Sequence, residues 1–449
     1  MFRNEMKQTY LSGNADEEGP RMNGNAHHDY EMGNGTDSFN LQKNNRSITR
    51  LTSRLSPRIR VLLGLIGVFT LITFLRGSGN GNHEQEMFDS DAPAWDPALP
   101  ESARWSLTNT PSYSPKKDIP NIAHFVRQIN RDKDYTPKAP FKVEFRHLLS
   151  YYSCHHYLNP DRIYFWTDTP REMLEDARVN GDIYTRALFR IPNLEFRPAI
   201  FPNVTAKGVK IDQYAHRSDF VRTRVMAKMG GQYLDDDAWV LRDLKPLRQS
   251  GFDNIFSLDE GARIAQAAWL SKPMNPLMLA FARLQEVVFN GEWLRASNDL
   301  VTALMVHFSR LPGDRSSLVL EKDAFFPGYW IGDELNMYYE VHDHDPNFQE
   351  PVEVRTDQNV LETFQYDFNW GWRRDWRRTW IIHGFSNELR ARNAFWMFKE
   401  FKGFTPAYIL SRRSNIGRAL YPALRHMLDT GFLELEAKDL VAPPSSLDH

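Results

Sequence analysis

The chain has 449 residues and a formal net charge of −2, with 41% hydrophobic and 13% aromatic residues. This composition can supply one large hydrophobic core or two smaller ones, and the near-neutral charge gives no indication of a nucleic-acid partner. The single cysteine, Cys154, excludes an intramolecular disulfide framework and leaves the redox compartment open.

Residues 1–60 are rich in Asn, Gly, Asp, Glu and Ser, so we expect them to be disordered, because they cannot bury enough apolar surface to offset their ordering entropy. An uncharged apolar run then fills residues 61–75 and is closed by Arg76. Fifteen helical residues span about 22 Å, against roughly 30 Å for a hydrocarbon core, and flanking arginines and a thinner endomembrane can close that gap. A buried helix and a cleaved signal peptide are the alternatives. The polar flanks and the late position favour a single transmembrane signal anchor over residues 61–76.

Five arginines precede the apolar run, at positions 46, 50, 54, 58 and 60. This excess of positive charge predicts a cytoplasmic N-terminus and a lumenal remainder, which is the single-pass type II topology. Residues 77–117 are rich in Gly, Asn, Pro and Ser and are predicted to form a stalk. A folded domain is then expected over residues 118–437, and a disordered tail over 438–449. Asn203 heads an N-glycosylation sequence, which is usable only on the lumenal side.

Strand and helix signals alternate through the first half of the folded domain. Strands are expected at 122–126, 162–166 and 194–196, with helices at 145–157 and 171–179 between them. This alternation predicts an α/β fold with a mostly parallel central sheet. Further helices are expected at 276–289, 298–308 and 409–428, and a late strand at 379–383. Ligands of such sheets bind at the carboxyl ends of strands, which is where Asp168 falls.

The most informative stretch covers residues 216–244. Asp219 and Arg222 are three residues apart, so on a helix they project from neighbouring positions of one face. Gly230 and Gly231 end that helix, because glycine adopts the left-handed cap conformation without a Cβ clash. Tyr233 and Leu234 then form a short strand, after which three consecutive acids emerge.

Two of these acids, Asp235 and Asp237, lie on the same side of an extended chain, and Asp236 lies on the other. Two carboxylates at the end of a buried strand form half of a site for a hard divalent cation that also binds a substrate phosphate. Three consecutive acids are by themselves more often a solvated turn or a helix cap. A calcium loop of the EF-hand kind is excluded, because residues 238–241 supply none of its required ligands.

The order Ser218-Asp219-x-x-Arg222, followed by Gly230-Gly231-x-Tyr233-x-Asp235-x-Asp237, resembles the DXD-containing sugar-transfer family, the group around glycosyltransferase family 32. The resemblance implies a GT-A-like nucleotide-sugar-binding domain with Mn²⁺ (or Mg²⁺) held by Asp235 and Asp237. Together with these two acids, Asp219 and Arg222 are the expected catalytic residues. The latter two are also expected to bind the donor sugar. Retention of the anomeric configuration is implied as well.

Other segments resemble parts of the same family. The run Ile119-Pro120-x-Ile122-x-His124 is similar to the opening strand, which implies donor contacts from residues 124–126, that is His124, Phe125 and Val126, with Asp168 and Asp236 as further donor contacts. Here Arg127 replaces the tryptophan usual in the family. The late strand ends in His383, which by resemblance completes the metal shell or else packs in the core.

These features predict a metal-dependent glycosyltransferase that moves a sugar from a UDP-sugar or GDP-mannose to a glycan or glycolipid acceptor. The order of anchor, stalk and lumenal domain resembles Golgi glycosyltransferases, so we expect a Golgi (or ER) membrane protein. A catalytically inactive lumenal sugar-binding or scaffold protein is the main alternative, supported by Arg127 and by Ser297-Asn298 in place of a usual Gly-Pro. A metal-dependent phosphohydrolase is a weaker one, because it has no need of the Asp-x-x-Arg helix.

Overall fold

The computed structural model describes residues 114–129, 140–311, 316–329, 332–342, 371–385 and 403–440. By its internal contacts the chain divides into residues 1–81 and 82–449, and every described residue belongs to the second unit. The predicted cytoplasmic tail, the anchor at 61–76 and the first part of the stalk therefore lie outside the described residues. In the part that is described, no helix is both long enough and apolar enough to cross a membrane.

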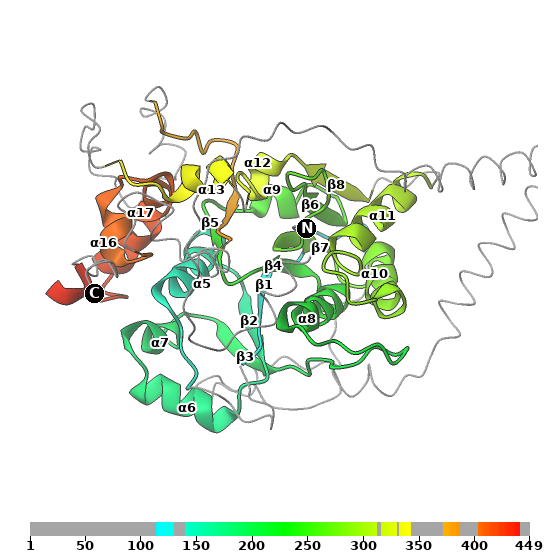
Figure 1. Cartoon of the computed structure of the whole chain (residues 1–449), viewed down its shortest axis with the longest axis horizontal. Helices are drawn as coiled ribbons and strands as arrows, with labels where there is room; N and C mark the ends of the chain where they lie inside the picture. The colour runs from blue at the N-terminus through cyan, green and yellow to red at the C-terminus, as the bar shows by residue number, and fades with distance from the viewer. Residues whose placement is uncertain are drawn as a thin grey trace, which may run out of the picture. The chain divides into compact units, whose positions relative to one another are not determined.

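A seven-stranded sheet forms the centre of the domain, in the order β3-β2-β1-β4-β7-β6-β8 (Figure 1). Its strands are β1 (Ile122–Arg127), β2 (Arg162–Thr167), β3 (Leu194–Pro198), β4 (Gly231–Leu234), β6 (Asn254–Ser257), β7 (Ala268–Ser271) and β8 (Ser317–Leu320). Only β7 runs antiparallel to its neighbours β4 and β6, and all other pairs in the sheet are parallel. The predicted α/β fold with a mostly parallel sheet is confirmed.

Helices cover both faces of this sheet. The first face packs against α5 (Phe145–Leu158), α6 (Arg171–Asn180) and α7 (Ile183–Leu188), and the second against α8 (Tyr214–Met229), α10 (Pro276–Val288) and α11 (Asn298–Ser309). Successive strand residues alternate between the two cores: Phe125 and Phe165 enter the first, whereas Val126 and Trp166 enter the second. Strands buried on both faces are typical of parallel sheets.

A second, two-stranded sheet pairs β5 (Ala238–Val240) with β9 (Ile381–His383) in antiparallel register, with Ala238 opposite His383. The remaining described elements are α9 (Lys245–Arg248), α12 (Lys322–Phe325), α13 (Gly332–Tyr339), α16 (Pro406–Ser411), α17 (Asn415–Asp429) and the 3₁₀ helix η4 (Ala437–Leu440). The small sheet therefore brings a late segment of the chain next to the acids that follow β4.

Two predicted boundaries differ from the structure. The prediction of a single helix at 409–428 is wrong, because the structure has two helices there, α16 and α17. Arg412 ends the first with a left-handed backbone (φ 55°), and the Ser414 hydroxyl begins the second by accepting a hydrogen bond from the Gly417 amide (3.0 Å). The folded domain also exceeds its predicted limits. Lys272 donates from Nζ to the carbonyl of Pro115 (2.8 Å) inside the predicted stalk, and η4 extends to Leu440.

The turn between α8 and β4 requires its two glycines. Both have positive φ, +62° at Gly230 and +94° at Gly231. A Cβ at Gly230 would lie 2.4 Å from the backbone nitrogen of Pro273, and one at Gly231 would lie 2.5 Å from the carbonyl oxygen of Ile122. Residues other than glycine adopt such a backbone only at a cost, and their Cβ atoms would not fit here. The two glycines therefore let β4 start directly after α8 and pair with β1.

Candidate active site

The carboxyl ends of β2, β1 and β4 meet at one edge of the sheet, because these three strands are parallel neighbours. Asp168 directly follows β2 and Asp235 directly follows β4, so the structure places both at the edge where the sequence predicted them. Asp168 Oδ1 accepts a hydrogen bond from the Ile129 amide (2.8 Å), which ties the loop after β1 to the loop after β2.

Asp235, Asp237 and His383 form a group whose ligand atoms all lie within 4.8 Å of one another. His383 Nε2 is 3.2 Å from Asp237 Oδ1 and 3.9 Å from Asp235 Oδ2. The pairing of β5 with β9 brings His383 to the acids, and the Gly384 amide extends it by donating to the Asp237 carbonyl (2.8 Å). In an octahedral shell with bonds of about 2.1 Å, ligand atoms lie roughly 3 to 4.2 Å apart, and both distances from His383 fall within this range.

The chemistry of this donor set also fits a divalent cation. Two carboxylates suit Mg²⁺ or Mn²⁺, and an imidazole adds a ligand that transition metals accept. Burial raises the pKa of Asp235, and the nearby Asp237 carboxylate raises it further, against Arg222 and His383. For His383, burial disfavours the charged form, but Asp237 and Asp235 outweigh it and the pKa is raised. These groups therefore lack a full set of compensating positive charges, which a bound cation would provide.

Arg222 connects α8 to this group. Its Nη2 lies 3.2 Å from Asp219 Oδ1 and its Nη1 lies 3.2 Å from Asp235 Oδ1, while Nη1 also donates to the Gln266 carbonyl (3.0 Å). The guanidinium stands over the Tyr233 ring at 4.9 Å, and the Tyr233 hydroxyl donates to Asp235 Oδ1 (2.5 Å). Burial raises the pKa of Asp219 to about 7, although Arg222 lowers it. The structure thus brings together the four residues for which a catalytic role was predicted.

Asp236 points away from its two neighbours toward α5, where the Tyr151 hydroxyl donates to its Oδ1 (2.8 Å). Arg127 Nε lies 3.9 Å from Asp236 Oδ2, and the same guanidinium donates to the Lys142 carbonyl (2.9 Å). Burial raises the pKa of Asp236 to about 6. Sequence reasoning missed Tyr151, because nothing in the spacing of the α5 residues separates it from the other buried positions of that helix.

The side chain of His124 has a structural role. It is fully buried, its Nε2 lies 2.9 Å from the Gly230 carbonyl, and its Nδ1 accepts from Trp166 Nε1 (3.1 Å). Burial lowers the pKa of His124 to about 4, so the ring is neutral and both nitrogens are used within the protein. The side chains of Phe125 and Val126 are buried as well. Donor contacts from residues 124–126 remain a prediction that would rely on their backbone.

Asn203 lies in the loop between β3 and α8 and is exposed, so its glycosylation remains a prediction. Sequence reasoning also missed the residues around Asp219. His216, Gln285 and Trp293 lie beside it, on α8, on α10 and in the loop that follows α10.

An open α/β sheet with two carboxylates and a histidine at its carboxyl edge, linked to an Asp–Arg pair, is an arrangement that could hold a divalent cation next to an anionic ligand. Residues 146–253 match the family described as "Glycosyltransferase sugar-binding region containing DXD motif". This span includes Asp219, Arg222 and all three acids. The protein is therefore a glycosyltransferase of the DXD type.

Solved glycosyltransferases give distant likenesses. For GlyE of Streptococcus pneumoniae TIGR4, identity is 10% over 71% of this chain and 66% of that chain, with a TM-score of 0.32. For the PaToxG glycosyltransferase, identity is 15% over 46% and 74%, with a TM-score of 0.30. For the galactosyltransferase LgtC in complex with donor and acceptor sugar analogues, it is 14% over 46% and 76%, with a TM-score of 0.25. Because each TM-score is below 0.5, we draw no conclusion from these likenesses. Comparison with curated proteins gives no match.

Proposed function

We propose that this glycosyltransferase is metal-dependent and transfers a sugar from a nucleotide-sugar donor, a UDP-sugar or GDP-mannose, to a glycan or glycolipid acceptor. The observation that supports it most directly is the convergence of Asp235, Asp237 and His383 within 4.8 Å, with the Asp219–Arg222 pair attached to them. A scaffold protein has no need to keep such a buried arrangement of charges, which is costly to form unless each charge has partners.

Asp235, Asp237 and His383 are the residues that would hold Mn²⁺ (or Mg²⁺). When bound, the ion supplies Lewis acidity that neutralises the charge gained by the departing diphosphate, a contribution of several kcal/mol. Arg222 adds a fixed positive charge at the same place, and its planar fork suits recognition of hydroxyl or phosphate oxygens better than lysine would. Asp219, oriented by Arg222, accepts hydrogen bonds from sugar hydroxyls.

We propose that transfer retains the anomeric configuration. In this scheme the bond between the anomeric carbon and the diphosphate oxygen breaks, and the acceptor hydroxyl oxygen forms the new bond on the face that the diphosphate leaves. The acceptor proton passes to the departing phosphate oxygen, so charge and atoms balance. Arg222 stabilises the departing oxygens throughout, because it is buried and already oriented before the reaction.

We further propose that residues 61–76 anchor the protein in the Golgi (or ER) membrane as a single-pass type II protein with a lumenal catalytic domain. The arginines before the apolar run support this orientation. Asn203 offers a test, because it is modified only if the domain enters the lumen. In cells, removal of N-glycans should change the mobility of the wild-type protein and not that of Asn203→Gln. The absence of any glycan on the wild type would contradict the lumenal orientation.

The activity is tested on the full-length protein with a panel of UDP-sugars and GDP-mannose, in Mn²⁺ and in chelator, by measuring released nucleotide. We expect Mn²⁺-dependent release from one donor, which the double variant Asp235→Asn/Asp237→Asn abolishes while it remains folded. Asp243→Asn, which removes an exposed acid a few residues further along the chain, is the matched control and should keep full activity. Full activity in the double variant, or no release from any donor, would refute the assignment.

A further inference from the structure

The three acids stand on a tight turn that leads from β4 into β5. The Ala238 amide donates to the Asp235 carbonyl (2.9 Å), which closes a four-residue turn with Asp236 and Asp237 at its centre. The Asp235 amide donates to the Ala267 carbonyl (2.8 Å), and the first backbone amide after β9 donates to the Asp237 carbonyl (2.8 Å). These backbone bonds hold the first, third and fourth residues of the turn, and Asp236 is held through its side chain.

Helix α5, which packs beside β5 (Figure 1), provides the group that holds Asp236. The Tyr151 hydroxyl donates to Asp236 Oδ1 (2.8 Å). A second hydroxyl of the same helix, that of Ser153, accepts from the Val240 amide of β5 (3.0 Å). The helix thus supports both the acid turn and the strand that follows it, and Tyr151 is the one of these two hydroxyls that bonds an acid.

The ring of Tyr151 is fixed by the core. The residue is fully buried, and its ring packs edge-on against Phe125 of β1 and Phe165 of β2, with centroid distances of 4.7 and 5.5 Å. Arg127, at the end of β1, approaches the other carboxylate oxygen of Asp236 at 3.9 Å. A carboxylate that has a partner at each oxygen gives them up only at a cost, so Asp236 stays directed toward α5.

The direction of Asp236 affects that of its two neighbours. Common turn types differ by a flip of their central peptide, which here joins Asp236 to Asp237. Fixing Asp236 against α5 restrains this peptide, so that Asp235 and Asp237 face His383 together. Groups that orient metal ligands from outside the coordination shell typically account for about 10- to 100-fold in metal affinity.

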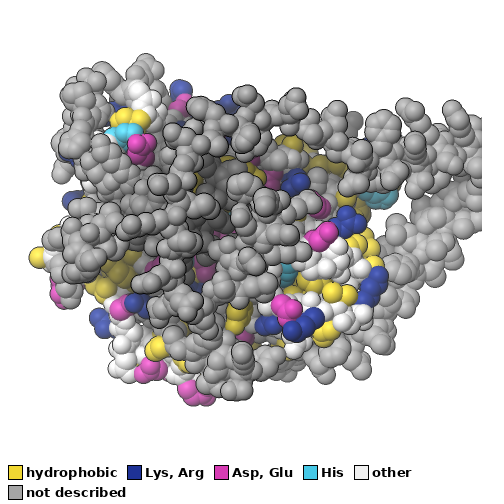
Figure 2. Space-filling view, viewed as in Figure 1, with side chains coloured by type: hydrophobic (Ala, Val, Ile, Leu, Met, Phe, Trp, Pro, Cys, Tyr) yellow, Lys and Arg dark blue, Asp and Glu magenta, His cyan; other side chains and the backbone are white. Residues whose placement is uncertain are grey.

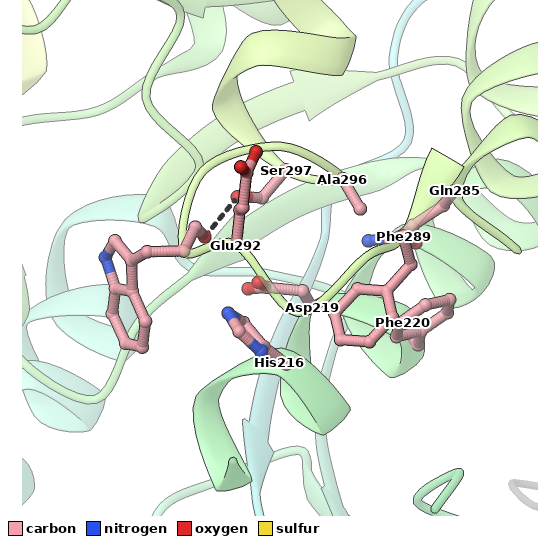
Figure 3. Close-up of a pocket in the computed structure, with 9 residues that line it drawn as sticks. His216, Asp219, Phe220, Gln285, Phe289, Glu292, Ala296 and Ser297 are labelled. Carbon is pink, nitrogen blue, oxygen red and sulfur yellow. Dashed lines mark hydrogen bonds between the residues drawn. The ribbon is translucent and has the colours of Figure 1, made fainter. Parts of the chain in front are cut away.

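Asp219 is supported by different groups. Figure 3 shows it beside the rings of His216, Phe220 and Phe289, and Phe289 packs against the other two at 5.2 and 5.6 Å. These rings belong to α8 and to the end of α10, on the opposite face of the sheet from α5. A change at Tyr151 therefore reaches the metal group through the acid turn and leaves the support of Asp219 in place.

We propose that Tyr151 is a positioning residue for the metal group: its hydroxyl, acting through Asp236, keeps Asp235 and Asp237 directed at the cation and so sets the affinity for Mn²⁺. This role rests on the proposed metal-dependent function. Because Tyr151 acts through another residue, its effect should appear in metal binding itself and not only in turnover.

Mn²⁺ binding to the full-length protein, measured by the electron paramagnetic resonance signal of the free ion, tests this role. Tyr151→Phe keeps the ring and its packing and removes only the hydroxyl. We expect its dissociation constant for Mn²⁺ to rise about tenfold. Ser153→Ala is the matched control, because it removes another α5 hydroxyl, one that bonds a backbone amide of β5. Its dissociation constant should stay within about twofold of the wild-type value.

A double-variant cycle tests whether the effect passes through Asp236. In Asp236→Ala the Tyr151 hydroxyl has no carboxylate to hold, so adding Tyr151→Phe should change the dissociation constant by less than about twofold. Urea unfolding in chelator measures the structural contribution separately. Tyr151→Phe and Ser153→Ala should both lose stability, because each removes a hydrogen bond, but only Tyr151→Phe should lose metal affinity.

Three results would overturn this role while sparing the proposed function: Tyr151→Phe binds Mn²⁺ as tightly as the wild type, Ser153→Ala weakens binding as much as Tyr151→Phe, or the effect of Tyr151→Phe persists in the Asp236→Ala background. If the wild type itself binds no Mn²⁺, the metal-dependent function fails and the role of Tyr151 fails with it.

Discussion

Replacing Arg222 by methionine gives the sharpest test of the electrostatic account of the site. The guanidinium faces two carboxylates at 3.2 Å, and all three side chains are at most about a quarter exposed. At an effective dielectric constant of about 20, each charge pair at this distance is worth roughly 5 kcal/mol, part of which is cancelled by desolvation of the arginine. Removing one partner of a buried pair costs about 3–5 kcal/mol, so we expect the free energy of unfolding to fall by that amount in metal-free buffer.

The same variant should respond more strongly to metal. Without Arg222, the carboxylates of Asp219 and Asp235 lose their nearest positive charge, so the potential at the metal group becomes more negative. Urea unfolding of Arg222→Met and wild type, with chelator and with saturating Mn²⁺, measures both effects. Binding at 100 times the dissociation constant stabilises a protein by about 2.7 kcal/mol, and the gain for the variant should exceed that for the wild type.

Arg224→Met is the matched control, because Arg224 lies on the same helix and pairs with Glu286. It should cost less stability, and its response to Mn²⁺ should equal that of the wild type. The reasoning is refuted if Arg222→Met loses no more stability than Arg224→Met, or if Mn²⁺ stabilises it less than it stabilises the wild type.

Three further predictions concern the histidines. His383→Gln should weaken Mn²⁺ binding by at least about tenfold, measured as the metal concentration that raises the melting temperature halfway, and an unchanged midpoint would remove His383 from the metal group. His124→Phe should lower the free energy of unfolding, measured in urea, by about 2–4 kcal/mol, because it leaves the Gly230 carbonyl and Trp166 Nε1 without partners. The affinity for nucleoside diphosphate should stay unchanged. Unchanged stability with a loss of that affinity would instead make His124 a ligand-binding residue. Burial, together with His426 and His155, lowers the pKa of His156 to about 4. Between about pH 6.5 and 4 the unfolded chain therefore binds more protons than the folded chain. The stability linked to His156 is fully present above pH 6.5 and is lost as the pH falls. About 1–2 kcal/mol should disappear by pH 5, after allowance for partial exposure, and His156→Phe should flatten this dependence in melting curves at pH 7 and pH 5.

Charges on the visible face of the molecule are mixed. Figure 2 shows described Lys and Arg side chains interspersed with Asp and Glu, which agrees with the net charge of −2. The described side chains on this face therefore form no large patch of one charge that could steer a substrate.

Local properties of the sequence were enough to predict much of the fold. The strands near residues 122, 162 and 194 and the helices at 145 and 171 all appear within two residues of their predicted limits. The Gly230–Gly231 turn and the shared face of Asp219 and Arg222 were also predictable. These features depend on backbone dihedral preferences and on side-chain periodicity, both of which are encoded over a few neighbouring residues.

Contacts between distant segments were decided by the tertiary structure alone. The placement of His383 depends on the pairing of β9 with β5, and the antiparallel strand β7 enters the sheet between β4 and β6. The contact of the Tyr151 hydroxyl with Asp236 arises in the same way, from helix α5, which packs against one face of the sheet. Strand pairing and helix packing are selected by the burial of the whole core, and the free energy of that burial is shared over many residues. A local sequence pattern can therefore predict the acids of this site but not the groups that surround them.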